Sequence, residues 1–420
     1  MVQKTKSLYK NHYEYVIIVT TFLAVVITNY VGFQFPPLSH LIIPELDIDE
    51  AAFSKLFASF MLPGVLLSLV GGLLCDKFGT KRCITVCSII SFIGIVGRIF
   101  IFEYGAFYIF MFLAGIMQML VAINVPKIMA NWVPSGKIGV YIGFIMAGSP
   151  LGMALAMATS AMFPSIKSAF ISSAIAYFVV MLIWIIFLKN SPNDRKENNR
   201  ENLINKPSAV VDTIPLGKGL KIVMKNKYMW LMGICFGFFL SAVTTINTFL
   251  PLALQVEKGM SAVTAGGLTS ITMIGNIFGA LAGPSICYRI GSIRKYLVAT
   301  TFLMAILTAF VWKDTDGIVL IIGLFVLGFA VSAALTQMIS MPVLFKDIGA
   351  TLAGTASGFV TTIRLFLSIL LPSYIIMPLV GDNYVLLYYI MGGFGLIAGA
   401  MSIALPDFFQ EAKSRSKKKQ

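Results

Sequence analysis

Charged residues are scarce in this sequence, and histidines are scarcer still. Only 12% of the 420 residues are charged, whereas a soluble domain carries about 25%. This deficit excludes an ordinary water-facing surface and leaves lipid as the simplest surroundings. The two histidines, His12 and His40, fall outside the apolar stretches, so a histidine metal site or proton relay within a membrane has no residues to build on.

Motifs for covalent or nucleotide chemistry are also missing. None of the five cysteines belongs to a CxxC pair, which argues against metal ligation and disulfides. A phosphate-binding loop is absent, so ATP-driven transport is not expected. No nucleophile–base set occurs at one depth of the apolar segments, so we expect neither an enzyme nor a cofactor. The first apolar run, residues 15–35, lacks a small-residue cleavage site, and no cleaved signal peptide is predicted.

Apolar residues make up 58% of the chain and gather in long runs. A helix needs about 20 such residues to span the hydrocarbon, and its backbone groups must find partners within it. The sequence therefore predicts an all-α membrane protein with twelve transmembrane helices. The segments are 14–36, 52–74, 83–102, 106–130, 138–163, 168–188, 228–254, 262–285, 296–312, 317–345, 350–377 and 383–405.

The basic residues orient these helices. With the N-terminus in the cytoplasm, 25 of the 32 Lys and Arg residues lie on the cytoplasmic side and four on the other. Cytoplasmic loops carry such an excess, so we expect a multi-pass protein of the cell membrane with both termini inside. The same topology explains the net charge of +14, and no nucleic-acid motif accompanies it.

A polar stretch divides the chain near its middle. Residues 189–227 contain SPNDRKENNRENLINKP and nine basic residues, which is typical of a cytoplasmic linker. A short surface helix is expected at Leu216–Met224. The predicted domains are a six-helix half at 1–188, the linker, a second six-helix half at 228–405 and a basic cytoplasmic tail at 406–420.

Two loops at corresponding places in the halves share a pattern. The loop after the second helix reads GLLCDKFGTKR from Gly72 to Arg82, and the loop after the eighth reads GPSICYRIGSIRK. Gly79 and Gly291 each precede a basic pair, and glycine permits a tight reversal there. Internal repetition is the usual construction of secondary transporters.

The first of these loops resembles the loop signature of the major facilitator superfamily. The matching positions are Gly72, Asp76, Lys77, Gly79, Lys81 and Arg82. The resemblance implies a fold of two pseudo-symmetric six-helix halves, alternating access, and a cavity lined by helices one, four, seven and ten. It also implies that these six residues form a conformational latch, the alternative being that the basic ones only fix topology. The second loop departs from the pattern, because Tyr288 stands where an acid is expected.

Three basic residues fall inside predicted helices, where a charge costs about 2.5–3.5 kcal/mol. Arg364 is mid-helix on one face with Ser357, Thr361 and Ser368, and its guanidinium matches a planar oxyanion. Lys127 shares a face with Asn124, and either substrate binding or snorkelling to the cytoplasmic headgroups would explain it. This part of the chain also resembles organic-anion and cyanate/nitrate–nitrite members of the superfamily, at Asn124, Pro126, Lys127, Trp132, Pro134 and Lys137. Arg98 is expected to snorkel or to contact Glu103.

Acidic residues, by contrast, fall only at helix ends or in loops, so the cavity should be neutral or positive. This favours a small organic or inorganic anion, taken up with a proton or exchanged for another anion. The predicted binding residues are Arg364, Lys127, Asn124, Asn29, Tyr30, Thr245, Thr248, Thr336, Gln337 and Thr361. For the hydroxyl side chains, helix packing is the alternative role.

The sequence thus favours a secondary carrier, expected to be a monomer in the lipid bilayer with a small-molecule substrate and no nucleic-acid partner. A carrier of a neutral or drug-like solute, or a receptor that keeps the fold without transport, remains the alternative.

Overall fold

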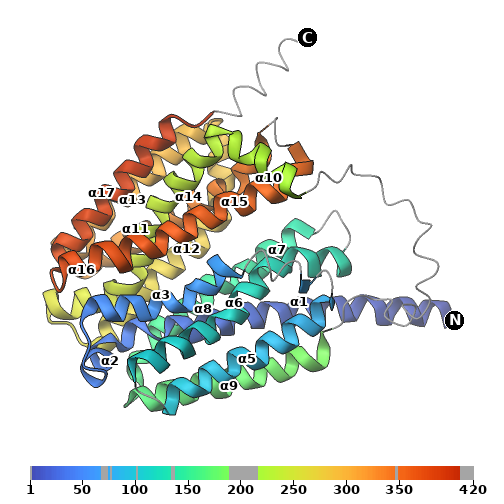
Figure 1. The fold of residues 1–420 in the computed structure, drawn as a ribbon, viewed down its shortest axis with the longest axis horizontal. Helices are drawn as coiled ribbons and strands as arrows, with labels where there is room; N and C mark the ends of the chain where they lie inside the picture. Colours follow the sequence, from blue (N-terminus) through green and yellow to red (C-terminus); the bar gives the residue numbers. More distant parts are fainter. Residues whose placement is uncertain are drawn as a thin grey trace, which may run out of the picture. The chain divides into compact units, whose positions relative to one another are not determined.

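The computed structural model describes residues 2–67, 74–75, 78–100, 103–133, 138–188, 216–345 and 349–406. Within these ranges the chain is helical and contains no strand. Eleven helices among them are long and apolar enough to cross a membrane. The remaining predicted segment, 52–74, begins in α3 (Glu50–Leu66), and its residues 68–73 lie outside the described residues. The all-α membrane architecture expected from the sequence is therefore present (Figure 1).

Contacts divide the chain into two compact units. The first contains residues 1–46, 56–156 and 162–210, and the second contains 47–55, 157–161 and 211–420. Besides α3, the helices of the first half are α1 (Val2–Phe33), α2 (Ser39–Glu45), α5 (Thr80–Phe100), α6 (Tyr104–Trp132), α7 (Ile138–Met146), α8 (Gly148–Thr159) and α9 (Ile166–Phe187). Helix α5 packs against α6 and α9, and α1 packs against α6 and α9.

The second compact unit includes the short helix α10 (Leu216–Lys225), which lies in the predicted linker where a surface helix was expected. The others are α11 (Lys227–Lys258), α12 (Ala262–Ile290), α13 (Ile293–Asp314), α14 (Gly317–Ser340), α15 (Gly349–Ile369), α16 (Met377–Val380) and α17 (Tyr384–Ile403). Helix α11 packs against α15 and α17, and α12 packs along α14.

Prolines account for two departures from the predicted segments. The first span runs on to Glu45 instead of ending near residue 36, because Pro36 and Pro37 form a short 3-10 turn that leads into α2. The fifth span is broken at Ala147. Pro150 has no N–H to donate to the carbonyl of Met146, so the helix cannot continue regularly there.

Glycines allow α12 and α14 to approach backbone to backbone. A Cβ on Gly279 would lie 2.2 Å from the carbonyl oxygen of Phe329, and one on Gly275 would lie 2.1 Å from that of Phe325. A Cβ on Gly328 of α14 would lie 1.8 Å from the carbonyl oxygen of Thr272. Small residues at such spacing are the usual means of close helix packing in membranes, so this seam sets the geometry of the second half.

Candidate functional site

The polar residues predicted from the sequence occur in both halves, and each half is described by itself. In the second half, Arg364 lies on α15 and is half-buried. Its Nε is buried and has no hydrogen-bond partner among the described residues. No carboxylate in the described part of the chain forms an ion pair with it. Thr361, one turn earlier on the same face, is also half-buried. A cation of this kind is suited to an anionic ligand.

The hydroxyl residues of α11 bond mainly to backbone. Thr244 donates to the carbonyl of Ser368 at 3.2 Å, and Ser241 donates to that of Leu367 at 3.1 Å. Pro372 lacks the N–H that would serve the Ser368 carbonyl, so Thr244 replaces it. Thr245 and Thr248 donate to Ser241 and Thr244 of their own helix. These hydroxyl groups therefore form hydrogen bonds within the helix bundle, which is the alternative role in helix packing given for them in the sequence analysis.

Thr336 and Gln337 lie on α14. Thr336 donates to the carbonyl of Ala333 at 3.1 Å. Gln337 is 9% exposed, and its amide makes no hydrogen bond to another described residue. Of the two predicted residues Thr336 and Gln337, Gln337 is therefore the one whose side chain can form hydrogen bonds with a ligand.

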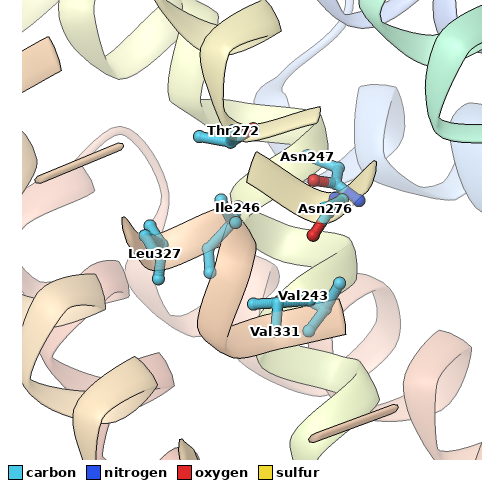
Figure 2. A pocket seen from close by; sticks show the side chains of 8 residues that line it. Val243, Ile246, Asn247, Thr272, Asn276, Leu327 and Val331 are labelled. Carbon is cyan, nitrogen blue, oxygen red and sulfur yellow. The ribbon is translucent and has the colours of Figure 1, made fainter. Parts of the chain in front are cut away.

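A small pocket in the same half was not predicted. It is lined by Val243, Ile246, Asn247, Thr272, Asn276, Leu327, Gly328 and Val331 of α11, α12 and α14. Figure 2 shows the amide groups of Asn247 and Asn276 at one side of it and aliphatic side chains around the rest. The Oδ1 of Asn276 is buried without a partner among the described residues. The available sequence signal was the presence of two asparagines inside predicted spans, outside the charged positions and the hydroxyl stripes.

In the first half, Asn29 of α1 is the centre of a side-chain network. Its Oδ1 accepts hydrogen bonds from Gln118 of α6 at 2.9 Å and from Ser149 of α8 at 3.0 Å, and its Nδ2 donates to Val25. Gly152 brings α8 close enough for this, since a Cβ there would lie 2.2 Å from the carbonyl oxygen of Val26. The network joins three helices and leaves Asn29 little capacity for a ligand. The neighbouring Tyr30 is half-buried.

Asn124 and Lys127 share α6 as predicted, but their polar groups are occupied. Asn124 donates to the carbonyl of Leu120, and Lys127 Nζ donates to the carbonyl of Cys75 at 3.1 Å. Lys127 thus bonds to the residue directly before Asp76 of the signature loop, a partner that neither sequence-based explanation had included.

Only part of the predicted latch can be described, because Gly72, Asp76 and Lys77 lie outside the described residues. Gly79 has φ of +86° and Gly291 has φ of +68°, which confirms the expected tight reversal in both copies of the loop. Lys81 is half-buried, and Arg82 is exposed.

The expectation for Arg98 is wrong. The side chain is 0% exposed and makes no described contact with Glu103. It donates to the carbonyl of Val31 and to Ser173 Oγ, both at 3.1 Å, and its guanidinium lies 4.4 Å from the ring centre of Phe170. In a continuous helix the N–H of Phe35 would donate to the carbonyl of Val31. Here it donates to the carbonyl of Gly32, so the Val31 carbonyl lacks its helical partner. A cation at this end of α1 is also favourable to the helix dipole.

These contacts make Arg98 a structural residue. We expect Arg98→Ala to reduce the free energy of unfolding by about 3–5 kcal/mol, since it leaves a large cavity and removes a connection between α1, α5 and α9. Arg98→Lys should recover only part of this, because an ammonium group cannot bridge both acceptors and stack on Phe170. Thermal unfolding of the purified protein measures both. Unchanged melting of Arg98→Ala would contradict the assignment.

A bundle of membrane helices in two halves, with polar side chains such as Arg364 and Asn29 inside it, is typical of membrane carriers. The chain belongs to the Major Facilitator Superfamily, whose sequence model matches residues 17–372. This confirms the family predicted from the Gly72–Arg82 loop.

Curated relatives match at low identity. The chain is 24% identical over 245 residues to the hexuronate transporter of Bacillus subtilis (strain 168), covering 57% of this chain and 56% of that protein. It is 26% identical over 263 residues to the probable galactarate/D-glucarate transporter GarP of Escherichia coli (strain K12), covering 57% and 59%. The match to the probable sulfoacetate transporter SauU of Cupriavidus necator is 22% over 339 residues, 77% of each. The chain therefore spans little more than half the length of the first two. Their names describe transporters, in agreement with the expectation that this chain is not an enzyme.

Solved structures share the fold. A variant of the nucleoside transporter NupG aligns with a TM-score of 0.74 at 16% identity, covering 93% of this chain and 99% of that one. The inward-open xylose transporter XylE from E. coli aligns with a TM-score of 0.68 at 18% identity, covering 94% and 97%. These likenesses establish the twelve-helix fold and nothing about the solute.

Proposed function

We propose that the protein is a secondary active transporter that moves a small anion across the cytoplasmic membrane by alternating access. The observation that carries this proposal is Arg364, a half-buried cation of a transmembrane helix whose buried Nε has no partner among the described residues. The names of the curated relatives add support, since hexuronate, D-glucarate and sulfoacetate are all anions.

Arg364 would bind the carboxylate or other oxyanion with a planar pair of hydrogen bonds. Thr361 and Gln337 would orient the remaining polar groups of the solute. We place Lys127 and Asn124 second, because their side chains already bond to backbone carbonyls. Asn29, Tyr30, Thr245, Thr248 and Thr336 would contribute to the walls of the binding cavity.

The halves at 1–188 and 228–405 would rock around this site, with both termini in the cytoplasm and the Gly72–Arg82 loop as the latch. Since no carboxylate of the chain is expected at midplane depth, exchange for a second anion, or a proton carried by the substrate or by an acid at a helix end, would complete the cycle.

Counterflow into liposomes tests the proposal. Purified protein is reconstituted into liposomes loaded with unlabelled D-glucuronate, D-glucarate or sulfoacetate, and the same labelled anion is added outside. We expect transient accumulation of at least one label, dependent on the unlabelled anion inside. Binding without flux would indicate a receptor instead, and counterflow of only uncharged solutes would overturn the anion assignment.

A further inference from the structure

The pocket between α11, α12 and α14 contains polar groups that the proposed function leaves unused. Asn247 is 8% exposed, and its side chain makes no hydrogen bond to another described residue. Asn276 donates to Met273 Sδ at 3.5 Å, but its buried Oδ1 accepts nothing from the described residues. Buried polar atoms are usually paired. A buried amide oxygen without a described partner, beside a second amide that lines the same pocket, therefore points to a bound group that is not part of the protein.

The size and chemistry of the pocket restrict that group. Its volume is about 10 Å³, enough for one water-sized group and too small for a carboxylate or a sugar ring. An asparagine amide offers both a donor and an acceptor, so the best partner is a group that also does both. A hydroxyl group meets this condition.

The contacts between α11 and α15 relate the level of the pocket to that of Arg364. Gly233 and Gly237 of α11 contact Ile363 and Leu367 of α15, so the two helices run parallel. Thr244 bonds to Ser368, which places them at one level. Arg364 lies four residues before Ser368, and Asn247 lies three residues after Thr244. Arg364 and Asn247 are therefore about 10 Å apart along the helix axes. An arginine side chain and an extended six-carbon acid are together long enough to span this axial separation.

The region of α11 at Asn247 is also adapted for contact with a ligand. Pro251 has no N–H to donate to the carbonyl of Asn247, so the helix is locally open at this residue. On the facing helix, the absence of a side chain at Gly328 keeps α14 close to Thr272. Gly328 and Thr272, which both line the pocket, thus bring the backbones of α14 and α12 together there.

We propose that this pocket receives a hydroxyl group of the substrate, and that the transported anion is therefore a polyhydroxylated carboxylate of the sugar-acid class. The inference rests on the proposed function and narrows it. Asn247 would donate to the hydroxyl oxygen, and Asn276 Oδ1 would accept the hydroxyl proton. An acid without hydroxyl groups would leave both amides unpaired in the bound state.

Two diacids that differ only in their hydroxyl groups provide the test. D-glucarate and adipate have the same six-carbon chain and the same two carboxylates, but adipate has no hydroxyl groups. For the unmodified protein in liposomes, we expect kcat/KM for D-glucarate to exceed that for adipate by at least about 100-fold, because sites built around a substrate hydroxyl reject analogues that lack it. Equal transport of adipate, or a preference for sulfoacetate, would overturn the inference and leave the proposed function standing.

Variants assign the preference to the pocket. Asn247→Leu and Asn276→Leu keep the approximate side-chain volume, and each should reduce the D-glucarate to adipate ratio at least tenfold. The matched control is Thr308→Val on α13, which also removes a buried polar atom without a described partner but lies outside the pocket. It should leave the ratio unchanged. If the leucine variants fold and keep the ratio, the pocket does not bind the substrate.

Failure of the broader proposal has a different signature. If the unmodified protein shows no counterflow of D-glucarate, adipate, D-glucuronate or sulfoacetate, the proposed function itself fails. If the leucine variants do not fold, the comparison of D-glucarate with adipate on the unmodified protein still decides whether hydroxyl groups are recognised.

Discussion

Arg364→Ala is expected to abolish anion counterflow while the protein remains folded. The guanidinium group would supply the charge-assisted hydrogen bonds to the substrate oxyanion, and loss of such a desolvated contact costs about 2–5 kcal/mol. This corresponds to a fall in kcat/KM of roughly 30- to 5,000-fold. Arg364→Lys should keep weak transport with a raised KM, because an ammonium group preserves the charge but not the planar pair of donors. Counterflow of D-glucarate measures both variants.

The control for this experiment removes an equal charge from the same half. Lys258 at the end of α11 forms an ion pair with the exposed Asp316. Lys258→Gln should leave kcat/KM within about twofold, because this pair lies at the end of the helix with one partner in solvent, where ion pairs contribute little. Thermal unfolding establishes that each variant is folded. Normal transport by folded Arg364→Ala would remove the basis for an anion site on α15.

Gly279→Ala is expected to destabilise the second half strongly. The added Cβ would lie 2.2 Å from the carbonyl oxygen of Phe329, and a backbone atom cannot rotate away as a side-chain end can. The α12–α14 seam would have to separate along its length, at a cost of about 3 kcal/mol or more. We expect little monodisperse protein in size-exclusion chromatography, and a clearly lowered melting temperature for what remains.

Gly267→Ala is the matched control because it changes the same residue type on the same helix. A Cβ at Gly267 meets no atom within 4 Å, and alanine favours a helix over glycine by about 1 kcal/mol. This variant should melt at the same temperature as the unmodified protein or above it. If Gly279→Ala and Gly267→Ala behave alike, close backbone contact along the seam does not determine stability.

The helical architecture was predictable because it depends on local properties of the sequence. Apolar runs place the spans to within a few residues, and Gly79 and Gly291 adopt the left-handed backbone expected from their loops. The departures at Pro37 and Pro150 arise where proline redirects the chain instead of ending it. Such outcomes depend on whether neighbouring helices supply other partners for the freed carbonyls.

The roles of individual polar side chains were harder to predict. In the sequence, Arg98 lies inside a predicted helix as a snorkelling arginine would. In the structure it is buried by α1 and α9, which are far from it along the chain. The hydroxyl stripe of α11 indicated a cavity, whereas Ser241 and Thr244 bond to α15. Periodicity identifies the face on which a side chain lies, but the helix that covers that face is determined by tertiary packing.

The bonds between α11 and α15 have a consequence for movement. Each of the two hydroxyl groups is shared: Ser241 donates to Gly237 and to Leu367, and Thr244 donates to Ser241 and to Ser368. If α15 slides, each donor can keep its bond to α11 while it releases the other, so neither hydroxyl is left unbonded in an apolar interior. The contact between α11 and α15 beside Arg364 can therefore release one of these hydrogen bonds at a time while each hydroxyl keeps an acceptor.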